Sequence, residues 1–358
     1  MENLLKNIQM RHIMQMFTII TSLFYHLQTN TAQDEIREIT FDKSLLEPDG
    51  TFTEQSLPKF LAQAYQEKKL TNPDFSKEEC LKAKKMDVQG SFNTLQLFQI
   101  TSTCRQTSPA SMYIIKEAKN GLGEATKLQA VAKYPGMKEL LAPATPPKGF
   151  PSVILPIAYF SYAGPGGYGL HYIAVMPSAK GKVFCQVVKE YRDNQSPQNA
   201  EKLKQTYKIL GAELANFHKR FNHGDLHCFN MFYNGEYFGL IDNETITTAK
   251  GLQSASDDNL KLFLGLASTS EPAERKNIIQ GIDLKTWYNL AFKSFIEGYL
   301  DAYQSADQLR VMQELKKMFN SNQTFPWLKI DSAELQKLRT SYINPVFDEI
   351  EKQRSTKK

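Results

Sequence analysis

The fold of this chain is decided by the stretch His223-Gly224-Asp225-Leu226-His227-Cys228-Phe229-Asn230 and by Leu240-Ile241-Asp242-Asn243-Glu244 shortly after it. Two apolar runs, 231–233 and 237–241, follow the first segment and predict short strands. Asn234-Gly235 separates the runs and predicts a hairpin turn, because both residue types tolerate positive φ. We therefore expect Asp225 and Asn230 on a loop that enters the hairpin, and Asp242 where the chain leaves it.

The side chains gathered in this way suit one kind of chemistry. A carboxylate beside a hydroxyl group can take its proton, while an amide oxygen and a second carboxylate can hold Mg²⁺ on the phosphates of a nucleotide. Asn230 is the fifth residue after Asp225, which is the spacing of the kinase catalytic-loop pattern. Asp242 falls where that pattern places its second metal-binding aspartate.

At these residues the sequence resembles the protein-kinase-like superfamily. The segment from Asn222 to Glu244 is similar to the aminoglycoside phosphotransferase and choline kinase branch. There the loop commonly reads H-G-D-L-H-x-x-N and the metal motif reads I-D-x-E or I-D-x-D. The resemblance implies the α+β class and a bilobal protein-kinase-like fold, with a small antiparallel-sheet N-lobe and a mostly helical C-lobe.

The same resemblance implies an enzyme. It would be an ATP- and Mg²⁺-dependent phosphotransferase, a kinase that moves the γ-phosphate to the hydroxyl group of a small molecule or a protein. Asp225 would be the base, with Asn230 beside it in catalysis, and Asn230 and Asp242 would hold Mg²⁺. His223 and His227 would buttress the loop.

Two other functions stay open. One is a non-catalytic, pseudokinase-type module that binds a nucleotide or a partner. The other is a zinc hydrolase built on His223, Asp225 and His227, which leaves Asn230 and the Ile241-Asp242 pair unexplained.

An upstream segment supplies the nucleotide-binding half of the expected site. Residues 94–103 and 112–116 predict two strands, the second ending in Lys116. The resemblance implies that Lys116 reaches the α and β phosphates of ATP. The intervening turn contains no glycine, so its Thr107 and Ser108 are the candidates for contacting phosphate.

Lys116 needs an acidic partner that holds its ammonium group in place. Glu124 is ranked first, because it lies at the start of a helix predicted over 123–132. Glu139 is the alternative.

Further strands are expected at 153–160 and 168–176, and a hinge at 176–181. In this fold the hinge backbone bonds adenine. Because Pro177 has no N–H group, Ser178 or Ala179 is the expected donor.

The remainder of the chain predicts helices. An apolar stripe runs along a helix starting at Ser196-Pro197 and ending at Phe221. His218 is interpreted as a helix-terminal charge. Asp257-Asp258 is interpreted as a helix cap, with contact to a cationic substrate as the alternative. The other predicted helices cover 56–69, 182–192, 284–303, 309–319 and 331–351.

The composition is that of an ordinary globular protein, with 41% hydrophobic and 23% charged residues and a net charge of +5. Lysine and arginine are spread along the chain, so we expect no nucleic-acid partner. The four cysteines lack zinc-binding spacing and are interpreted as structural thiols. Asp74 and Lys82–Lys85 are interpreted as solvated surface.

The N-terminus has two interpretations. Basic residues, a short apolar run at 16–25 and then Ala32 follow the order of a signal peptide, which would make the protein secreted or exported. The alternative is an amphipathic helix or leader on a cytoplasmic protein. The run is too short for an integral membrane span. The predicted organisation is a leader at 1–32, an accessory segment at 33–90, the N-lobe at 91–177, the C-lobe at 178–352 and a basic tail at 353–358.

Overall fold

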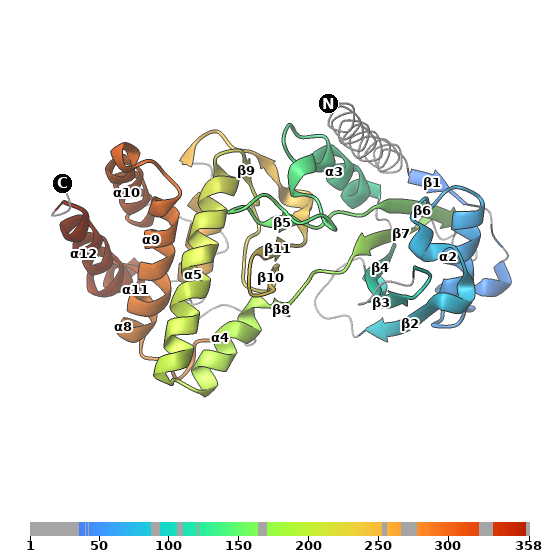
Figure 1. The fold of residues 1–358 in the computed structure, drawn as a ribbon, viewed down its shortest axis with the longest axis horizontal. Coiled ribbons are helices and arrows are strands. Elements are labelled where there is room, and N and C mark those ends of the chain that lie inside the picture. Colours follow the sequence, from blue (N-terminus) through green and yellow to red (C-terminus); the bar gives the residue numbers. More distant parts are fainter. Residues whose placement is uncertain are drawn as a thin grey trace, which may run out of the picture. The chain divides into compact units, whose positions relative to one another are not determined.

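A computed structural model describes residues 36–39, 41, 43–86, 94–105, 110–119, 122–163, 170–252, 256–265, 278–321 and 332–355 (Figure 1). The chain divides into two compact units. The first unit comprises Met1–Gln129 and Pro156–Ser178, and the second comprises Ala130–Leu155 and Ala179–Lys358. The predicted leader and the last residues of the basic tail lie outside the described residues.

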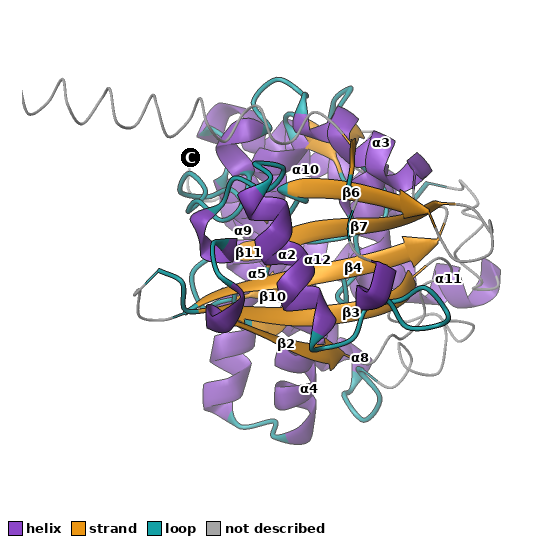
Figure 2. Ribbon diagram, turned by 90° about the vertical axis from the view of Figure 1, so that its right-hand side faces the viewer, coloured by secondary structure: helices purple, strands orange, loops and turns teal. Residues whose placement is uncertain are grey.

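The first unit is built on a sheet. In the described part of the chain its strand order is β1-β6-β7-β4-β3-β2, with β1 parallel to β6 and all other neighbours antiparallel (Figure 2). The strands are β1 (Ile36–Glu38), β2 (Leu81–Met86), β3 (Thr94–Ser102), β4 (Ser111–Lys119), β6 (Ala158–Ala163) and β7 (Leu170–Pro177). The strands expected near 94–103 and 112–116 are confirmed as β3 and β4.

Helix α2 (Ser56–Gln66) covers one face of this sheet (Figure 2). Its apolar side chains, among them Phe60 and Leu61, pack with Phe98 of β3 and Ile115 of β4 in one buried cluster. Alternate residues of a strand point to opposite faces, so Phe98 and Ile115 face α2 while Lys116 faces away from it.

The accessory segment contributes more to this unit than its polarity suggests. The lysine-rich residues 82–85, interpreted from the sequence as solvated surface, belong to β2, which pairs with β3 along its whole length. Leu81 and Ala83 point inward while the lysines point to solvent, a common way to protect an edge strand.

The prediction of a solvated Asp74 is wrong. Asp74 is 3% exposed, because its carboxylate accepts a hydrogen bond from the Tyr113 hydroxyl and pairs with Arg105 Nε at 3.0 Å. Asn72 binds the same two residues, through Tyr113 Oη at 2.7 Å and Arg105 Nη2 at 3.2 Å. These bonds fix the turn at 72–75 to the β3–β4 hairpin.

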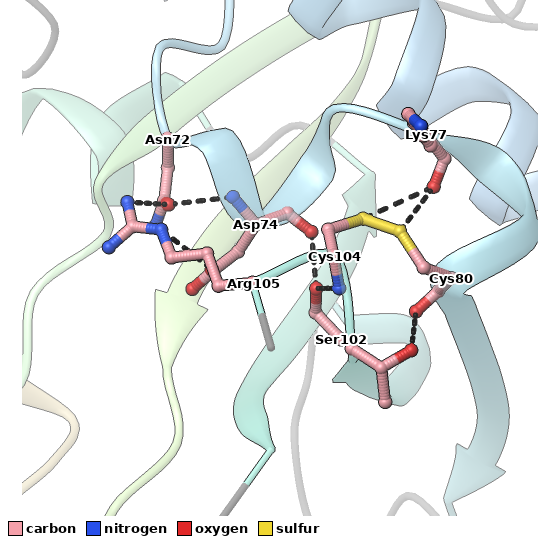
Figure 3. Close-up of a disulfide and its surroundings, with 8 residues drawn as sticks. Asn72, Asp74, Lys77, Cys80, Ser102, Cys104 and Arg105 are labelled. Atoms are coloured by element: carbon pink, nitrogen blue, oxygen red, sulfur yellow. Dashed lines mark hydrogen bonds and ion pairs between the residues drawn. A yellow bond between two sulfur atoms is a disulfide. The ribbon is translucent and has the colours of Figure 1, made fainter. Parts of the chain in front are cut away.

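A disulfide joins the same region (Figure 3). Cys80, just before β2, is bonded to Cys104, just after β3. The interpretation of these two cysteines as thiols is therefore wrong, because pairing of β2 with β3 brings together residues 24 positions apart in sequence. Cys185 and Cys228 are buried free thiols.

The second unit is mostly helical and carries small sheets. A sheet of order β5-β11-β10-β8 and the pair β12-β9 comprise β5 (Ser152–Val153), β8 (Lys182–Val183), β9 (Phe221–Asn222), β10 (Met231–Tyr233), β11 (Phe238–Leu240) and β12 (Thr247–Thr248). The helices are α3 (Leu122–Ala132, which begins in the first unit), α4 (Phe184–Asp193), α5 (Pro197–His218), α6 (Ser256–Leu260), α8 (Leu284–Trp287), α9 (Lys293–Asp301), α10 (Ser305–Phe319), α11 (Ser332–Leu338) and α12 (Asn344–Ser355). The α+β class, with an antiparallel sheet followed by a largely helical part, is confirmed.

Helices α5 and α9 form the centre of the second unit. Their backbones approach closely at two glycines, where an added Cβ would lie 2.1 Å from Phe295 O at Gly211 and 2.0 Å from Lys208 O at Gly298. No side chain fits at either position, so the glycines set how closely the helices pack. None of the described helices is long and apolar enough to cross a membrane.

Several predicted elements differ from those observed. The strand expected at 153–160 is two strands in different sheets, β5 and β6, because Ile154 N donates to Leu240 O whereas Ile157 N donates to Val175 O. The helix expected to reach Phe221 ends at His218, and Phe221 begins β9. The helices expected at 284–303 and 331–351 are each interrupted by a π-helical turn.

Candidate functional site

The loop that carries Asp225 is held by a buried carboxylate. Asp258, in α6, is 0% exposed and accepts hydrogen bonds from the backbone N–H groups of His223 (2.7 Å) and Gly224 (2.9 Å). His218 Nε2 lies 3.3 Å from the same carboxylate, and its Nδ1 lies 3.0 Å from Tyr299 Oη. Helices α5, α6 and α9 therefore fix the backbone immediately before Asp225.

This network corrects two predictions. His218 is the last residue of α5, as expected, but it is 1% exposed and bonded on both ring nitrogens, so it supports the loop and does not merely end a helix. Asp258 neither caps a helix nor faces a substrate, because its oxygens are directed into the protein. Burial raises the pKa of Asp258, but the hydrogen bond and charge of His218, with His223, outweigh burial and leave that pKa below its usual range.

His223 ties the loop to the hairpin. Its ring Nδ1 accepts from Asp225 N at 3.3 Å, which leaves Nε2 to donate to Ile241 O at 3.1 Å. The expected buttressing contacts of His223 are thus present. Because both ring nitrogens are engaged, neither is available as a zinc ligand. Among the described residues, no group of three or more His, Cys, Asp or Glu side chains could hold a metal ion.

Asp225 has a partner that sequence analysis missed. Lys261, at the start of the π-helical turn Lys261–Gly265 after α6, places Nζ 2.9 Å from Asp225 Oδ1 and 2.8 Å from Gly224 O. The lysine side chain is 16% exposed and the Asp225 side chain 44% exposed. Asp225 is therefore anchored from the protein side while its carboxylate remains open to solvent.

The surroundings of Asp225 favour its charged form. Burial raises the pKa of Asp225, but the hydrogen bond from Lys261 and the charges of Lys261 and His227 lower it below its usual range. His227 Nε2 lies 3.8 Å from Asp225 Oδ2, the carboxylate oxygen that Lys261 does not contact. A carboxylate that stays ionised and oriented can accept a proton.

Asn230 and Asp242 lie at one end of the hairpin. Strands β10 and β11 pair Met231 with Leu240, and Ile241 N donates to Asn230 O at 3.0 Å. Gly235 has a φ of 100°, as the predicted turn requires. The hairpin is fastened to α5 by buried Glu213, which accepts from Phe238 N at 2.9 Å.

The oxygens of these two residues suit a hard cation. The Asn230 side chain donates through Nδ2 to Asp225 O at 3.0 Å, a bond that does not use its Oδ1. Asp242 is exposed and has a left-handed backbone with φ 61°, an uncommon conformation for a residue other than glycine and one often found at functional positions. An amide oxygen and a carboxylate are ligands that Mg²⁺ accepts, so the residues present fit this ion.

The first unit holds the expected lysine–glutamate pair. Lys116 Nζ lies 2.7 Å from Glu124 Oε1, with side chains 16% and 26% exposed. The separation of only eight residues is sufficient because α3 begins at Leu122, directly after β4 ends at Lys119. The alternative partner Glu139 instead pairs with Arg220 at 3.2 Å.

The expected hinge donor Ser178 is engaged in the sheet. Its N–H donates to Met112 O at 3.0 Å, which extends the β4–β7 pairing and makes this group a poor donor to adenine. Ala179 is the first residue of its stretch of the second unit. Thr107 and Ser108, the candidates for contacting phosphate, lie outside the described residues.

The sequence did not connect two residues, Asp258 and Lys261, with the Asp225 loop. Asp258 and Lys261 are three positions apart on consecutive helical segments, so both point toward the Asp225 loop. The spacing itself was visible in the sequence, but nothing local ties either residue to a loop more than thirty positions upstream.

No family model and no curated protein matches this chain. Among solved structures, the chain is similar to WaaP in complex with acyl carrier protein, at 12% sequence identity and a TM-score of 0.32. That similarity covers 68% of this chain and 91% of the WaaP chain.

Proposed function

We propose that this protein is a phosphotransferase of the protein-kinase-like type that uses ATP and Mg²⁺. The observation that carries the proposal is the geometry around Asp225. An ionised, partly exposed carboxylate is held by Lys261 on a loop whose last residue, Asn230, lies beside Asp242 at the end of a hairpin. This arrangement combines a base with two oxygen donors.

Each residue has a role in the proposed reaction. Asp225 orients the acceptor hydroxyl and takes its proton as the acceptor oxygen attacks the γ-phosphorus and the bond from that phosphorus to the β-γ bridging oxygen breaks, releasing ADP. Asn230 and Asp242 would hold Mg²⁺, which neutralises phosphate charge when bound. Lys116, oriented by Glu124, binds the nucleotide phosphates. Ala179 remains the candidate for a backbone contact with the adenine, because the N–H group of Ser178 already donates to Met112 O.

Lys261 keeps Asp225 charged and pointed in one direction. A charge-assisted hydrogen bond of this kind contributes about 1.5–3 kcal/mol. Its ammonium group also supports the backbone at Gly224, so it acts through Asp225 and the loop, as a positioning residue.

The disulfide supports the exported alternative for localisation. Cytosolic thiols are kept reduced, whereas disulfides persist in secreted and periplasmic proteins. Cys80 and Cys104 are bonded, so we infer that the protein folds in an oxidising compartment.

The experiment is a measurement of ADP release by the full chain with Mg-ATP, alone and with panels of aminoglycosides, choline and sugars. Mass spectrometry of the same protein reports autophosphorylation, which would indicate a protein acceptor. Asp225→Asn is expected to lower turnover by about 10²- to 10⁴-fold, since that is the contribution of a general base. Asp193→Asn, in an exposed ion pair with Arg192, is the matched control and should keep the parent rate.

Equal turnover by Asp225→Asn and Asp242→Asn variants and the parent would overturn this proposal. Binding of ATP by a parent protein that shows no turnover with any acceptor would instead favour the non-catalytic alternative.

A further inference from the structure

A cavity lies in the first unit, on the side of its sheet away from Lys116. Its volume is about 510 Å³, within the range of small-molecule sites. It is lined by the loop Glu47–Gln55, by Lys85 of β2 and by Gln96 and Phe98 of β3.

The cavity and Lys116 belong to opposite faces of the sheet. Gln96 pairs with Glu117, and Leu97 pairs with Lys116. Because side chains alternate along a strand, Gln96 and Phe98 point to the face opposite Lys116. A molecule in this cavity is therefore distinct from the proposed nucleotide and does not depend on the proposed phosphotransfer.

The inner wall of the cavity holds an unsatisfied polar atom. Gln96 is 6% exposed, and its Oε1 has no hydrogen-bond partner among the residues that the structure describes. A buried acceptor left in this state destabilises the fold, and native structures contain few of them. Beside it, Phe52 and Phe98 line the cavity, and each is only 1% exposed because most of each ring packs into the core of the first unit.

The rim is acidic. Three carboxylates line it, from Glu47, Asp49 and Glu54, against one ammonium group, from Lys85. Hydrogen bonds from the Thr51 hydroxyl and backbone, with the charge of Lys85, lower the pKa of Asp49 below its usual range, so this carboxylate stays ionised. Glu54 Oε1 accepts from Lys85 N at 2.6 Å, which fixes it at the rim.

We propose that this cavity binds a small organic cation, an amine or a guanidine on an apolar frame. The cation donates a hydrogen bond to Gln96 Oε1 and faces the carboxylates of Asp49 and Glu54. Its apolar frame covers Phe52 and Phe98. The surplus of negative charge disfavours anions such as phosphates, and the buried acceptor selects ligands that carry N–H donors.

The test is isothermal titration calorimetry on the full chain with three probe cations: benzylamine, benzamidine and agmatine. Benzyl alcohol serves as the neutral counterpart of benzylamine. We expect at least one cation to bind with a dissociation constant below about 1 mM, which corresponds to a binding free energy of about −4 kcal/mol. Benzyl alcohol should bind at least tenfold more weakly. The proposal is overturned if none of the three cations binds at a concentration of 10 mM, which corresponds to a binding free energy of about −3 kcal/mol.

Substitutions assign the binding to this cavity. Gln96→Leu removes the acceptor and should weaken cation binding about tenfold or more, while the melting temperature stays equal or rises because the unsatisfied atom is gone. Gln99→Leu, on the same strand but the opposite face, is the matched control and should bind as the parent does. Asp49→Asn should also weaken binding. Unchanged binding by both Gln96→Leu and Asp49→Asn would show that the cation binds elsewhere.

Discussion

Lys261 Nζ lies 2.9 Å from Asp225 Oδ1, although 36 positions separate the two residues in sequence. The contact joins the proposed base to α6 and the turn after it, the same segment whose Asp258 holds the backbone of the loop. One short helical segment thus controls both where the loop lies and how the Asp225 carboxylate is charged.

The first prediction concerns Lys261. Lys261→Met should lower kcat about 10- to 100-fold, because this is the effect expected when one hydrogen bond to a charged group is lost. Because the lysine lowers the pKa of Asp225, its removal should raise that pKa and move the acidic limb of the kcat/KM profile to higher pH. Lys261→Arg should restore part of the rate. An acidic limb that does not move in Lys261→Met would contradict the role assigned to this residue.

The second prediction concerns Asp258. Asp258→Ala leaves the N–H groups of His223 and Gly224 buried without their acceptor and removes the partner of His218. We expect a loss of about 3 kcal/mol in the free energy of unfolding, measured by urea denaturation. Asp193→Asn is the control at the surface and should unfold at the parent urea concentration. A stable Asp258→Ala variant with full turnover would show that the loop does not need this support.

The third prediction follows from Glu117, the neighbour of Lys116 on β4. Its carboxylate is 1% exposed and accepts hydrogen bonds from the Tyr162 hydroxyl and from Phe52 N at 3.4 Å. Burial raises the pKa of Glu117 to about 7 from an ordinary 4.5. The folded chain therefore binds more protons than the unfolded chain between these two values, so the Glu117 contribution to stability decreases as pH rises through this range.

The measurement is the free energy of unfolding of the parent and of Glu117→Gln between pH 4 and pH 8.5. A neutral amide does not titrate, so the variant should gain up to about 3 kcal/mol relative to the parent from low to high pH. Parallel curves across the whole range would show that Glu117 titrates normally in the folded protein.

The fourth prediction concerns the disulfide. Cys80 and Cys104 are 24 positions apart in sequence. A disulfide that closes a loop of this length stabilises the folded protein by about 3 kcal/mol, because it lowers the entropy of the unfolded chain. The double variant Cys80→Ser/Cys104→Ser should unfold at lower temperature than the oxidised parent. Treatment with a phosphine reductant should lower the melting temperature of the parent and leave that of the double variant unchanged.

Local patterns in the sequence predicted most of the individual elements. The turn at Asn234-Gly235, the apolar stripe of α5 and the alternation in β3 depend on neighbouring residues, whose periodicity defines one buried face. Glu124 was predicted as the partner of Lys116 from its place at the start of the next helix. The structure accounts for the contact, because α3 begins directly after β4 ends.

The predictions were wrong where tertiary packing, and not the local pattern of polar and apolar residues, decides the structure. Asp74 is a polar residue in a polar segment, yet it is buried by Tyr113 and Arg105. The lysines of β2 are exposed as expected, but the segment that carries them forms a sheet edge that was not predicted. Ile154 to Ile157 continues an apolar run in the sequence, but its two ends hydrogen-bond to different sheets. Hydrophobic pattern cannot distinguish these cases, because burial of a polar group depends on partners far along the chain.

The sequence by itself determined the elements of the loop and hairpin and the residue types that they present: Asp225, Asn230 and Asp242 at turn positions beside short strands. Only the tertiary structure decided the charge and orientation of Asp225, through Lys261, and the support of its loop, through Asp258 and His218. The physical reason is the distance along the chain over which each interaction acts. Turn chemistry and periodicity act over a few residues, whereas a hydrogen bond that shifts the pKa of a carboxyl group acts between atoms that only folding brings together.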